Sequence, residues 1–320
     1  MRAGRPADLP ALLEVQRRLV QAGVFNCVPT ASWYERMLDG FDWAARSRVI
    51  EEAGTVVAGV LVVDRPIAEG TLARAEVVAG PELLVPLAEW GIALSRAAGA
   101  WGVQVWRGRG HSEGLERTGL RLARGFWRMD RSNLLAVPAI PLAEGYRLAD
   151  ATRSDLSEES WLESYELAFA EHWRHSPGTL EGMRRRRAAA GHVPDLELMA
   201  LDAGGRPAAF VISQLESYDS DRRPQPVGLV AMVGTVPGHR RRGLAAALTA
   251  EALRRLRAAG ARSSSLYVDA QNPTRAYEVY RRLGYEVGFE DEVWETVFTG
   301  GRTGGRALPG PSEGGRPPTS

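Results

Sequence analysis

The feature that most constrains this chain is the stretch VPGHRRRGLAAA at residues 236–247. An apolar run typical of a strand (228–236) ends there, a basic turn follows, and Gly243 precedes an alanine-rich segment typical of a helix. The first N–H groups of a helix have no partner within it, and the helix dipole adds positive potential there. The sequence therefore predicts a phosphate site at this turn. Three arginines add full positive charge to it: Arg240, Arg241 and Arg242.

A second stretch, SLYVDAQNPTRAYEVYRRLGYE at residues 265–286, predicts a strand, a helix that Asn272 caps with Pro273 at its first position, and a turn at Gly284. The turn at residues 240–245 matches the pattern (Gln/Arg)-x-x-Gly-x-(Gly/Ala). With both motifs at the expected distance, residues 146–299 resemble the GNAT acyltransferases, which use acetyl-CoA as acyl donor.

The resemblance implies a site for acetyl-CoA, and the scattered histidines give no reason to expect a metal. In the family, loop amides hold the pyrophosphate and the strand before the loop pairs with the pantetheine arm. The alternatives are that the arginines form a solvated basic turn, and that Asn272 only caps its helix. The implied cofactor residues are Gly234, Thr235, Val236, Arg240, Arg241, Arg242, Gly243, Leu244, Ala245, Ala246 and Asn272.

The implied catalytic residue is Tyr280, which shares a predicted helix face with Ala276 and Leu283. In the family a tyrosine here lies near the CoA sulfur and is proposed as the general acid. A phenol has a pKa of about 10 and a thiol of about 8.5, so full proton transfer to the thiolate is uphill by about 2 kcal/mol. We therefore expect a hydrogen bond to the thiolate, followed by late proton transfer. The alternative is a tyrosine packed in the core.

The general base is less well defined, because the strand GLVAMVGTV contains none of the carboxylates that many family members carry there. Glu171 and His172 follow the first predicted helix of this half, in the segment that borders the acceptor cleft in relatives, and they are the first candidates. Tyr267 and Asp269 alternate onto one face of the strand beside the CoA site, and Tyr267 is a candidate substrate contact. The alternatives are a solvated Glu171 and a structural His172.

The element pattern predicts an α/β fold (mixed α+β) with two GNAT-like units, each a twisted mixed sheet flanked by helices. Residues 1–136 resemble a degenerate copy, in which Pro81 opens a helix directly after a strand without the phosphate loop. The alternative is an unrelated α/β cap. We expect a linker at 137–145, the acetyltransferase domain at 146–299 and a disordered tail at 300–320.

Composition limits the other classes of function. All 40 basic residues are arginine, and the net charge of +1 gives no general preference for nucleic acid or acidic membranes. The single cysteine, Cys27, excludes an intramolecular disulfide, and no membrane span or leader is evident, so we expect a cytoplasmic monomer or homodimer. The pair His172 and His175 is too weak a pattern to predict a metal site.

The sequence thus predicts an N-acetyltransferase that acts by direct attack of a primary amine of a small molecule or peptide. A narrower alternative is the mycothiol synthase family, tandem chains that acetylate a cysteinyl amine. This chain has Leu229 and Val230 where that family carries an acid. Two further alternatives are a non-catalytic CoA-binding module and a nucleic-acid site at the arginine run 184–187, which we interpret as a solvated helix face.

Overall fold

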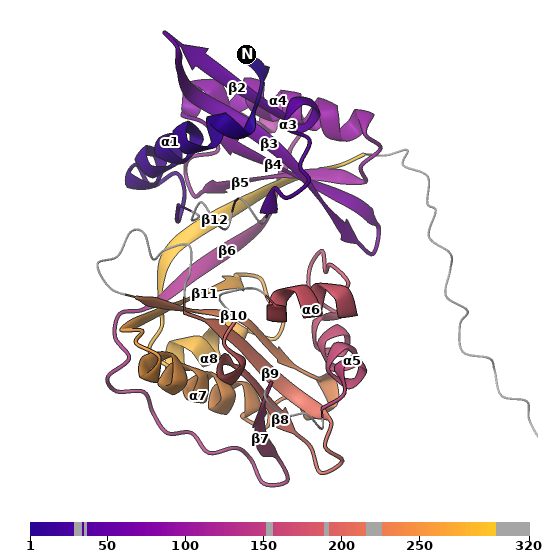
Figure 1. Cartoon of the computed structure of the whole chain (residues 1–320), viewed down its shortest axis with the longest axis vertical. Helices are drawn as coiled ribbons and strands as arrows, with labels where there is room; N and C mark the ends of the chain where they lie inside the picture. Colours follow the sequence, from indigo (N-terminus) through magenta and orange to yellow (C-terminus); the bar gives the residue numbers. More distant parts are fainter. Residues whose placement is uncertain (29–33, 35–36, 152–155, 189–191, 216–225, 299–320) are drawn as a thin grey trace, which may run out of the picture.

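A computed structural model describes residues 1–28, 34, 37–151, 156–188, 192–215 and 226–298 (Figure 1). The predicted tail at 300–320 lies outside these residues. The sequence pattern also favours a helix at residues 180–190, and the last residues of that helix lie outside the described part. In the N-terminal half the elements are β1 (Arg2–Ala3), η1 (Pro6–Asp8), α1 (Leu9–Gln21), α3 (Trp43–Arg46), β2 (Ser47–Glu52), β3 (Thr55–Ile67), β4 (Gly70–Val78), α4 (Pro81–Ala97), β5 (Gly102–Gly108), η2 (Leu115–Thr118) and β6 (Arg121–Arg131).

In the C-terminal half a strand precedes the turn at residues 236–243 and a helix follows it, as the sequence predicts. Its elements are β7 (Arg147–Asp150), α5 (Glu158–Phe169), α6 (Leu180–Ala188), η3 (Pro194–Leu196), β8 (Glu197–Leu201), β9 (Pro207–Gln214), β10 (Val227–Thr235), η5 (Pro237–His239), α7 (Leu244–Ala258), β11 (Ser263–Asp269), α8 (Ala276–Arg282) and β12 (Glu286–Val297).

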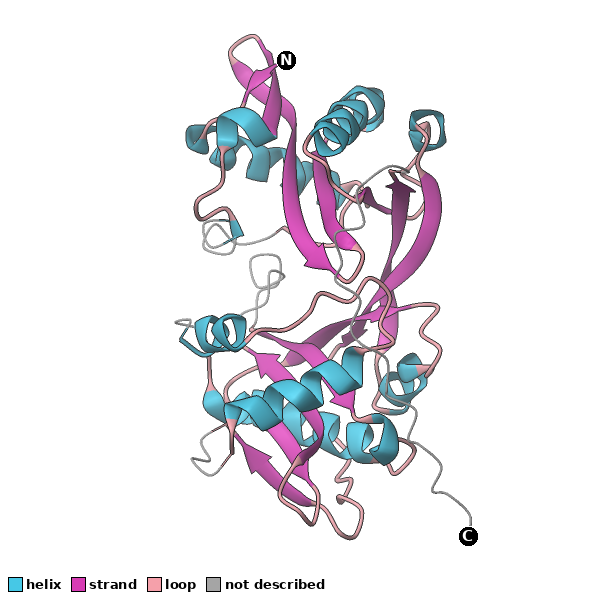
Figure 2. Cartoon of the chain, turned by 90° about the vertical axis from the view of Figure 1, so that its right-hand side faces the viewer, coloured by secondary structure: helices cyan, strands magenta, loops and turns pink. Residues whose placement is uncertain are grey.

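The described strands form one mixed sheet rather than two separate ones, in the order β1-β2-β3-β4-β5-β12-β6-β11-β10-β9-β8-β7. The two halves exchange their last strands, β6 and β12. Strand β12 lies antiparallel between β5 and β6, and β6 also pairs antiparallel with β11. Figure 1 shows these two strands running between the upper and lower halves, and Figure 2 shows the helices gathered on each half. The mixed α/β class is confirmed, with the two halves sharing a hydrogen-bonded sheet.

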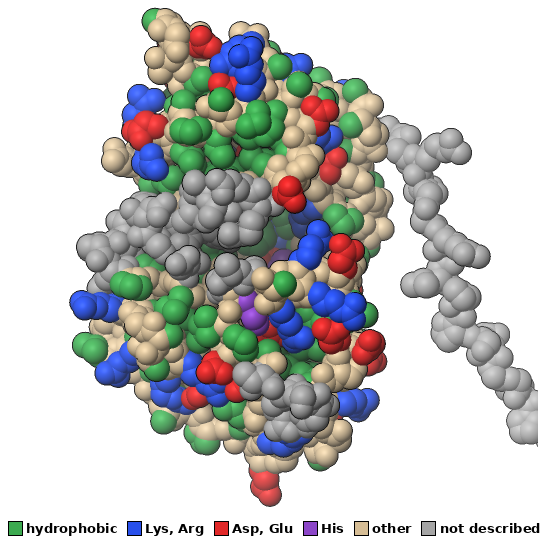
Figure 3. Space-filling model, viewed as in Figure 1, with side chains coloured by type: hydrophobic (Ala, Val, Ile, Leu, Met, Phe, Trp, Pro, Cys, Tyr) green, Lys and Arg blue, Asp and Glu red, His purple; other side chains and the backbone are tan. Residues whose placement is uncertain are grey.

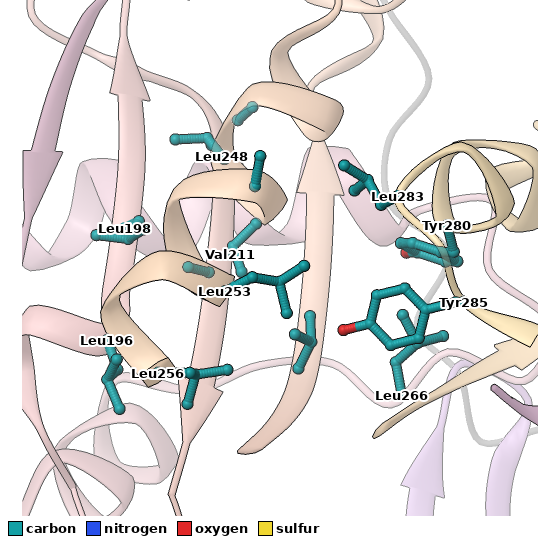
Figure 4. Packing of buried hydrophobic residues seen from close by; sticks show 14 of the residues in the cluster. Leu196, Leu198, Val211, Leu248, Leu253, Leu256, Leu266, Tyr280, Leu283 and Tyr285 are labelled. Atoms are coloured by element: carbon teal, nitrogen blue, oxygen red, sulfur yellow. The ribbon is translucent and has the colours of Figure 1, made fainter. Parts of the chain in front are cut away.

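Helix α7 packs on the C-terminal part of the sheet through the leucines that its periodicity predicts. Leu248, Leu253 and Leu256 are fully buried, and Figure 4 shows them beside Val211 of β9. The helix approaches the sheet closely, because a Cβ on Gly228 of β10 would lie 2.7 Å from Leu256 Cδ1. This packing fixes where the first turn of α7 meets the end of β10.

The segment before β6 contains only one short helical element. Residues Leu115–Thr118 form the 3-10 turn η2. Gly114 and Gly119 flank it with φ values of 89° and 87°. These left-handed residues limit the helical segment between them to a single turn.

We predict that Leu253→Ala lowers the free energy of unfolding by about 2–5 kcal/mol, because it leaves a cavity between α7 and the sheet. The measurement is urea denaturation followed by circular dichroism. Leu167→Ala is the matched control, since Leu167 lies in α5 with 46% of its surface exposed, and it should change stability by less than about 0.5 kcal/mol. Equal losses in the two variants would contradict this packing.

Candidate active site

The site begins where two parallel strands part. Strands β10 and β11 pair from Val227↔Ser263 to Val230↔Leu266, and the recorded pairing ends there. Strand β10 continues to Thr235 along β9, with a register shift between Val230 and Met232. The edge of β10 that faces β11 therefore lies open beyond the bulge, and its backbone can pair with an extended ligand.

Strand β10 leads directly into the N-terminus of α7. Gly243 precedes the helix with a φ of 78°, and a Cβ there would meet nothing within 4 Å. The first helical bond runs from Ala247 N to Gly243 O. The three preceding amides of the helix, from Leu244 to Ala246, have no acceptor recorded in the described part of the chain. They form a set of free donors at the positive end of the helix dipole.

A cleft with a volume of about 1060 Å³ contains the parted strands and the start of α7. Figure 3 shows a hollow between the two halves with hydrophobic atoms in its depth and charged side chains beside it. Most residues that the sequence singles out line this cleft. They are Gly234, Thr235, Arg240, Arg241, Gly243, Leu244, Ala245, Ala246, Asn272, Tyr280, Glu171, His172 and Tyr267.

Two of the predicted cofactor residues are not among the residues that line the cleft. The N–H of Val236 donates to Ala208 O at 2.9 Å, so its amide is already paired with the neighbouring chain segment. The side chain of Arg242 is exposed and donates to Gly238 O at 3.4 Å. Arg242 can add positive potential near the loop, but its guanidinium lies outside the cleft.

Glu171 and Arg240 form an ion pair at the phosphate-loop end of the cleft. Arg240 Nη1 lies 2.8 Å from Glu171 Oε2, and Arg240 Nε donates to Thr235 O at 3.3 Å. The carboxylate of Glu171 is thus directed to the loop arginine. The structure therefore favours Glu171 as a group that orients Arg240, and His172 as the base candidate.

His172 has the geometry of a neutral base. Its Nδ1 lies 3.1 Å from the carbonyl oxygen of Trp173. A carbonyl only accepts, so Nδ1 carries the proton and Nε2 keeps a free lone pair. Desolvation by the surrounding protein lowers the pKa of His172 below its ordinary value, although part of the ring is open to the cleft. At neutral pH the imidazole is uncharged and can accept a proton at Nε2.

Tyr280 lies on α8, the helix that follows β11. It is 7% exposed and lines the cleft. Burial raises the pKa of Tyr280 above that of a free phenol. Its hydroxyl therefore stays protonated at neutral pH and acts as a hydrogen-bond donor. In Figure 4 its ring lies beside that of Tyr285, and the two centroids are 6.2 Å apart.

Asn272 caps a turn rather than the helix, so this part of the sequence prediction is wrong. Its Oδ1 accepts from Thr274 N at 2.8 Å and from Thr274 Oγ1 at 2.6 Å. Helix α8 starts only at Ala276, because Arg275 adopts a left-handed φ of 56° and separates the turn from the helix. Asn272 still lines the cleft, and its amide nitrogen has no partner recorded in the described part of the chain.

The far wall of the cleft belongs to the N-terminal half, and the sequence analysis named none of its residues. Its residues come from β3, β4, β5 and β6, whose pairing across the exchanged strand β12 brings them to the cleft. Outside this lining, Cys27 of the N-terminal half has its Sγ 3.9 Å from the hydroxyl of Tyr267. The lining residues on this wall are Arg65, Arg74, Gln104, Trp106 and Phe126.

The N-terminal half also has two parallel strands that separate, but a side chain of the protein itself fills the gap between them. Strands β4 and β5 pair from Leu72↔Gly102 to Arg74↔Gln104. Beyond that point Arg107 is 1% exposed and donates to Val77 O at 3.0 Å and Ala79 O at 2.9 Å. Desolvation lowers the pKa of Arg107 to about 10, so it remains protonated at neutral pH.

The helix that follows β4 has an occupied N-terminus as well. Helix α4 begins at Pro81 with Glu82 in its first turn. A Cβ on Gly80 would lie only 2.8 Å from Glu82 Oε1, so this carboxylate covers the backbone before the helix. In the C-terminal half the gap between the parallel strands and the start of the following helix are both open. In the N-terminal half Arg107 fills the gap and Glu82 lies at the start of the helix.

The described residues support neither a metal site nor a membrane-spanning helix. No group of three His, Cys, Asp or Glu side chains within them is arranged to hold a metal ion. None of the helices in this part of the chain has the length and apolar character that a bilayer crossing requires.

The comparison with protein families matches the half that carries the open site. Residues 157–288 match the model of the Acetyltransferase (GNAT) domain. Residues 157–288 form a GNAT domain. This range begins near the start of α5 and ends within β12, so it includes β10, the loop and α7.

The GNAT domain has curated relatives named mycothiol acetyltransferase. The protein from Thermobispora bispora is 36% identical over 170 residues, which is 52% of this chain and 55% of the relative. The protein from Pseudarthrobacter chlorophenolicus is 30% identical over 212 residues, or 65% of this chain and 64% of the relative. The alignments thus span a little over half to about two thirds of the length of these relatives.

Solved structures extend the likeness in fold to both halves. A GCN5-related N-acetyltransferase from Sphaerobacter thermophilus has a TM-score of 0.75 at 24% identity, covering 92% of this chain and 94% of that one. A tandem GNAT protein from the clavulanic acid biosynthesis pathway has a TM-score of 0.62 at 17% identity, covering 96% and 98%. At these identities the likeness establishes the fold, which includes the N-terminal half.

We predict that His172 titrates below the ordinary histidine pKa of about 6.5 and that its neutral form is protonated at Nδ1. Long-range proton–nitrogen NMR spectra of protein labelled with nitrogen-15 in histidine measure both properties across a pH series. The variant His172→Gln identifies the signal by its loss. A midpoint above 6.5, or a neutral form protonated at Nε2, would contradict the proposed geometry.

Proposed function

We propose that this chain is an N-acetyltransferase that transfers the acetyl group of acetyl-CoA to a primary amine of a small molecule or peptide. The single observation that carries the proposal is the open edge of β10 leading into the uncapped N-terminus of α7. Together they supply backbone partners for a pantetheine arm and amides for a pyrophosphate. The GNAT domain and the names of the curated relatives support the same reaction.

In the proposed complex the amides of residues 241–246 and the Arg240 guanidinium hold the pyrophosphate, while Glu171 orients Arg240. Gly234 and Thr235 pair with the pantetheine arm through their backbone. Gly234 suits this place for a steric reason, because a Cβ there would collide with the ring of Phe210. Val236 directly follows the strand, and Asn272 offers its free amide nitrogen to the cofactor.

The proposed chemistry is a direct transfer. The amine nitrogen attacks the thioester carbonyl carbon, the C–S bond breaks, and the amine proton moves to His172 Nε2. The thiolate that leaves accepts a hydrogen bond from Tyr280 and takes up a proton to become free CoA. Because burial raises the pKa of Tyr280, its role is to donate this hydrogen bond rather than to lose its proton early.

We further propose that only one of the two predicted units binds the cofactor. In the unit at residues 146–299 the gap between the parted strands is open. In the unit at residues 1–136 the Arg107 guanidinium takes the backbone acceptors of the parted strand, and the carboxylate of Glu82 would repel a phosphate. Residues 137–145 join the two units.

A second candidate is acetylation of a mycothiol-type acceptor through a cysteinyl amine. The names of the curated relatives favour it, whereas the absence of an acid at Leu229 and Val230 in β10 speaks against it. A panel of amines that includes a cysteinyl compound distinguishes the candidates by release of free CoA from acetyl-CoA. Binding of CoA without turnover of any amine would instead indicate a non-catalytic module. A cytoplasmic location and a monomer or homodimer remain predictions.

We predict that CoA stabilises the wild-type protein against heat and that Gly243→Glu abolishes this effect, because the new side chain places a carboxylate in the phosphate site. At a CoA concentration of one hundred times the dissociation constant, the stabilisation is about 2.7 kcal/mol. Gly145→Glu is the matched control, since Gly145 also has a left-handed φ (82°) and open space around it but lies outside the cleft. If CoA still stabilised the Gly243→Glu variant, the proposed cofactor site would be wrong.

We predict that Tyr280→Phe lowers kcat at least tenfold and leaves the KM for acetyl-CoA within twofold. The reason is that a hydrogen bond to a charged group contributes about 1.5–3 kcal/mol and forms here only as the thiolate develops. Tyr285→Phe is the control, because Tyr285 is equally buried but pairs with Ser264 at 2.7 Å and does not line the cleft. Full turnover by Tyr280→Phe would remove its catalytic role.

A further inference from the structure

The wall of the cleft that the N-terminal half supplies carries charge of one sign. Arg65 lies on β3 and Arg74 on β4, and the register Val63↔Arg74 and Arg65↔Leu72 places both on the same face of the hairpin. Arg174, from the segment after α5, joins them. No carboxylate from the described part of the N-terminal half lines the cleft.

Two of these three arginines have a carboxylate partner outside the cleft lining. Arg174 Nη2 lies 2.7 Å from Glu295 Oε1 and its Nη1 lies 2.6 Å from Glu69 Oε1. Arg74 forms an ion pair with Glu76. These contacts fix the guanidinium groups in place and neutralise part of their charge.

Arg65 has no such partner among the described residues. Its Nη1 donates to Arg174 O at 3.0 Å and to Ser176 Oγ at 3.1 Å, both of which are neutral acceptors. Its remaining N–H groups have no acceptor recorded in this part of the chain. Burial and then the charge of Arg74 lower the pKa of Arg65, and the charge of Arg174 adds to this, whereas the carboxylate of Glu295 acts in the opposite direction. It remains a cation whose surroundings favour an anionic partner.

Three aromatic side chains that line the cleft, here called its aromatic floor, extend to the chain neighbour of the base candidate: Trp106, Phe126 and Trp173. The rings of Trp106 and Phe126 lie 4.9 Å apart, and the ring of Trp173 lies 6.2 Å from Phe126. Trp173 is the chain neighbour of His172, so the aromatic surface begins beside the base. It can hold the apolar part of a molecule whose ends reach His172 and Arg65.

We propose that the acceptor amine carries an anionic group, a carboxylate or a phosphate, and that Arg65 binds this group at the N-terminal wall. This inference rests on the proposed function and specifies its acceptor. Arg65 then determines specificity, while the aromatic floor contacts the middle of the molecule. Arg74 and Arg174 add positive potential on the same wall. The loop arginines at the other end of the cleft remain available to the cofactor.

The test compares acceptors that differ only in the anionic group. Glycyl-L-phenylalanine and glycyl-L-phenylalaninamide form the carboxylate pair, and phosphoethanolamine and ethanolamine form the phosphate pair. We expect the wild type to prefer the anionic member of at least one pair by tenfold or more in kcat/KM, and the pair that shows it identifies the anion. Arg65→Gln should reduce that preference to within twofold, through a higher KM for the anionic acceptor.

Further measurements separate binding of the anion from general damage. Arg65→Lys, which keeps the charge, should restore part of the preference. Arg65→Gln should leave the KM for acetyl-CoA and kcat/KM for the neutral acceptors within twofold. Arg121→Gln is the matched control, because Arg121 is exposed on β6 and lies outside the cleft.

Three outcomes would overturn the inference. They are equal kcat/KM for both members of both pairs in the wild type, an equal loss for both members in Arg65→Gln, and a change in the KM for acetyl-CoA alone. Turnover of neutral amines in those cases would leave the acetyltransferase proposal intact. If no amine is acetylated, calorimetric binding of the four probes to the CoA-saturated protein still decides the role of Arg65, since equal affinities for both members of each pair would also overturn it.

Discussion

The parting of β10 and β11 after the pair Val230↔Leu266 is the constraint on which the rest of the site depends. Two parallel strands that stay paired satisfy each other's backbone groups and leave no room for a ligand. Here the bulge in β10 turns its edge away from β11, and α7 starts directly after the strand. The open edge, the free amides and the cleft all follow from this separation.

The N-terminal half contains a similar separation of strands that is closed to ligands. Its strands β4 and β5 also part, so the backbone alone does not decide whether a gap can take a ligand. Arg107 satisfies the carbonyls of the parted strand from within, at the cost of burying a cation among neutral acceptors. A single side chain can therefore convert an open site into a closed structural element while the fold stays the same.

The exchange of β6 and β12 has a consequence for function as well as for stability. Because β12 lies between β5 and β6, the N-terminal half is held against the open face of the GNAT domain by hydrogen bonds. Arg65 and Trp106 thereby come to the cleft although they lie more than a hundred residues before the loop. A GNAT domain without this partner would keep the open edge of β10 and the loop before α7 but would lose this wall.

The sequence alone determined the strand, the turn and the helix around residues 236–247, on which the proposed cofactor site depends. The loop before Leu244, the leucine face of α7 and the position of Tyr280 depend on residues close to one another along the chain, so spacing was sufficient to predict them. Only the tertiary structure decided that Glu171 pairs with Arg240, that Arg107 fills the N-terminal gap, and that arginines of the N-terminal half line the same cleft as His172. These contacts depend on strand pairing between distant segments, and pairing partners are set by the packing of the whole sheet rather than by local pattern.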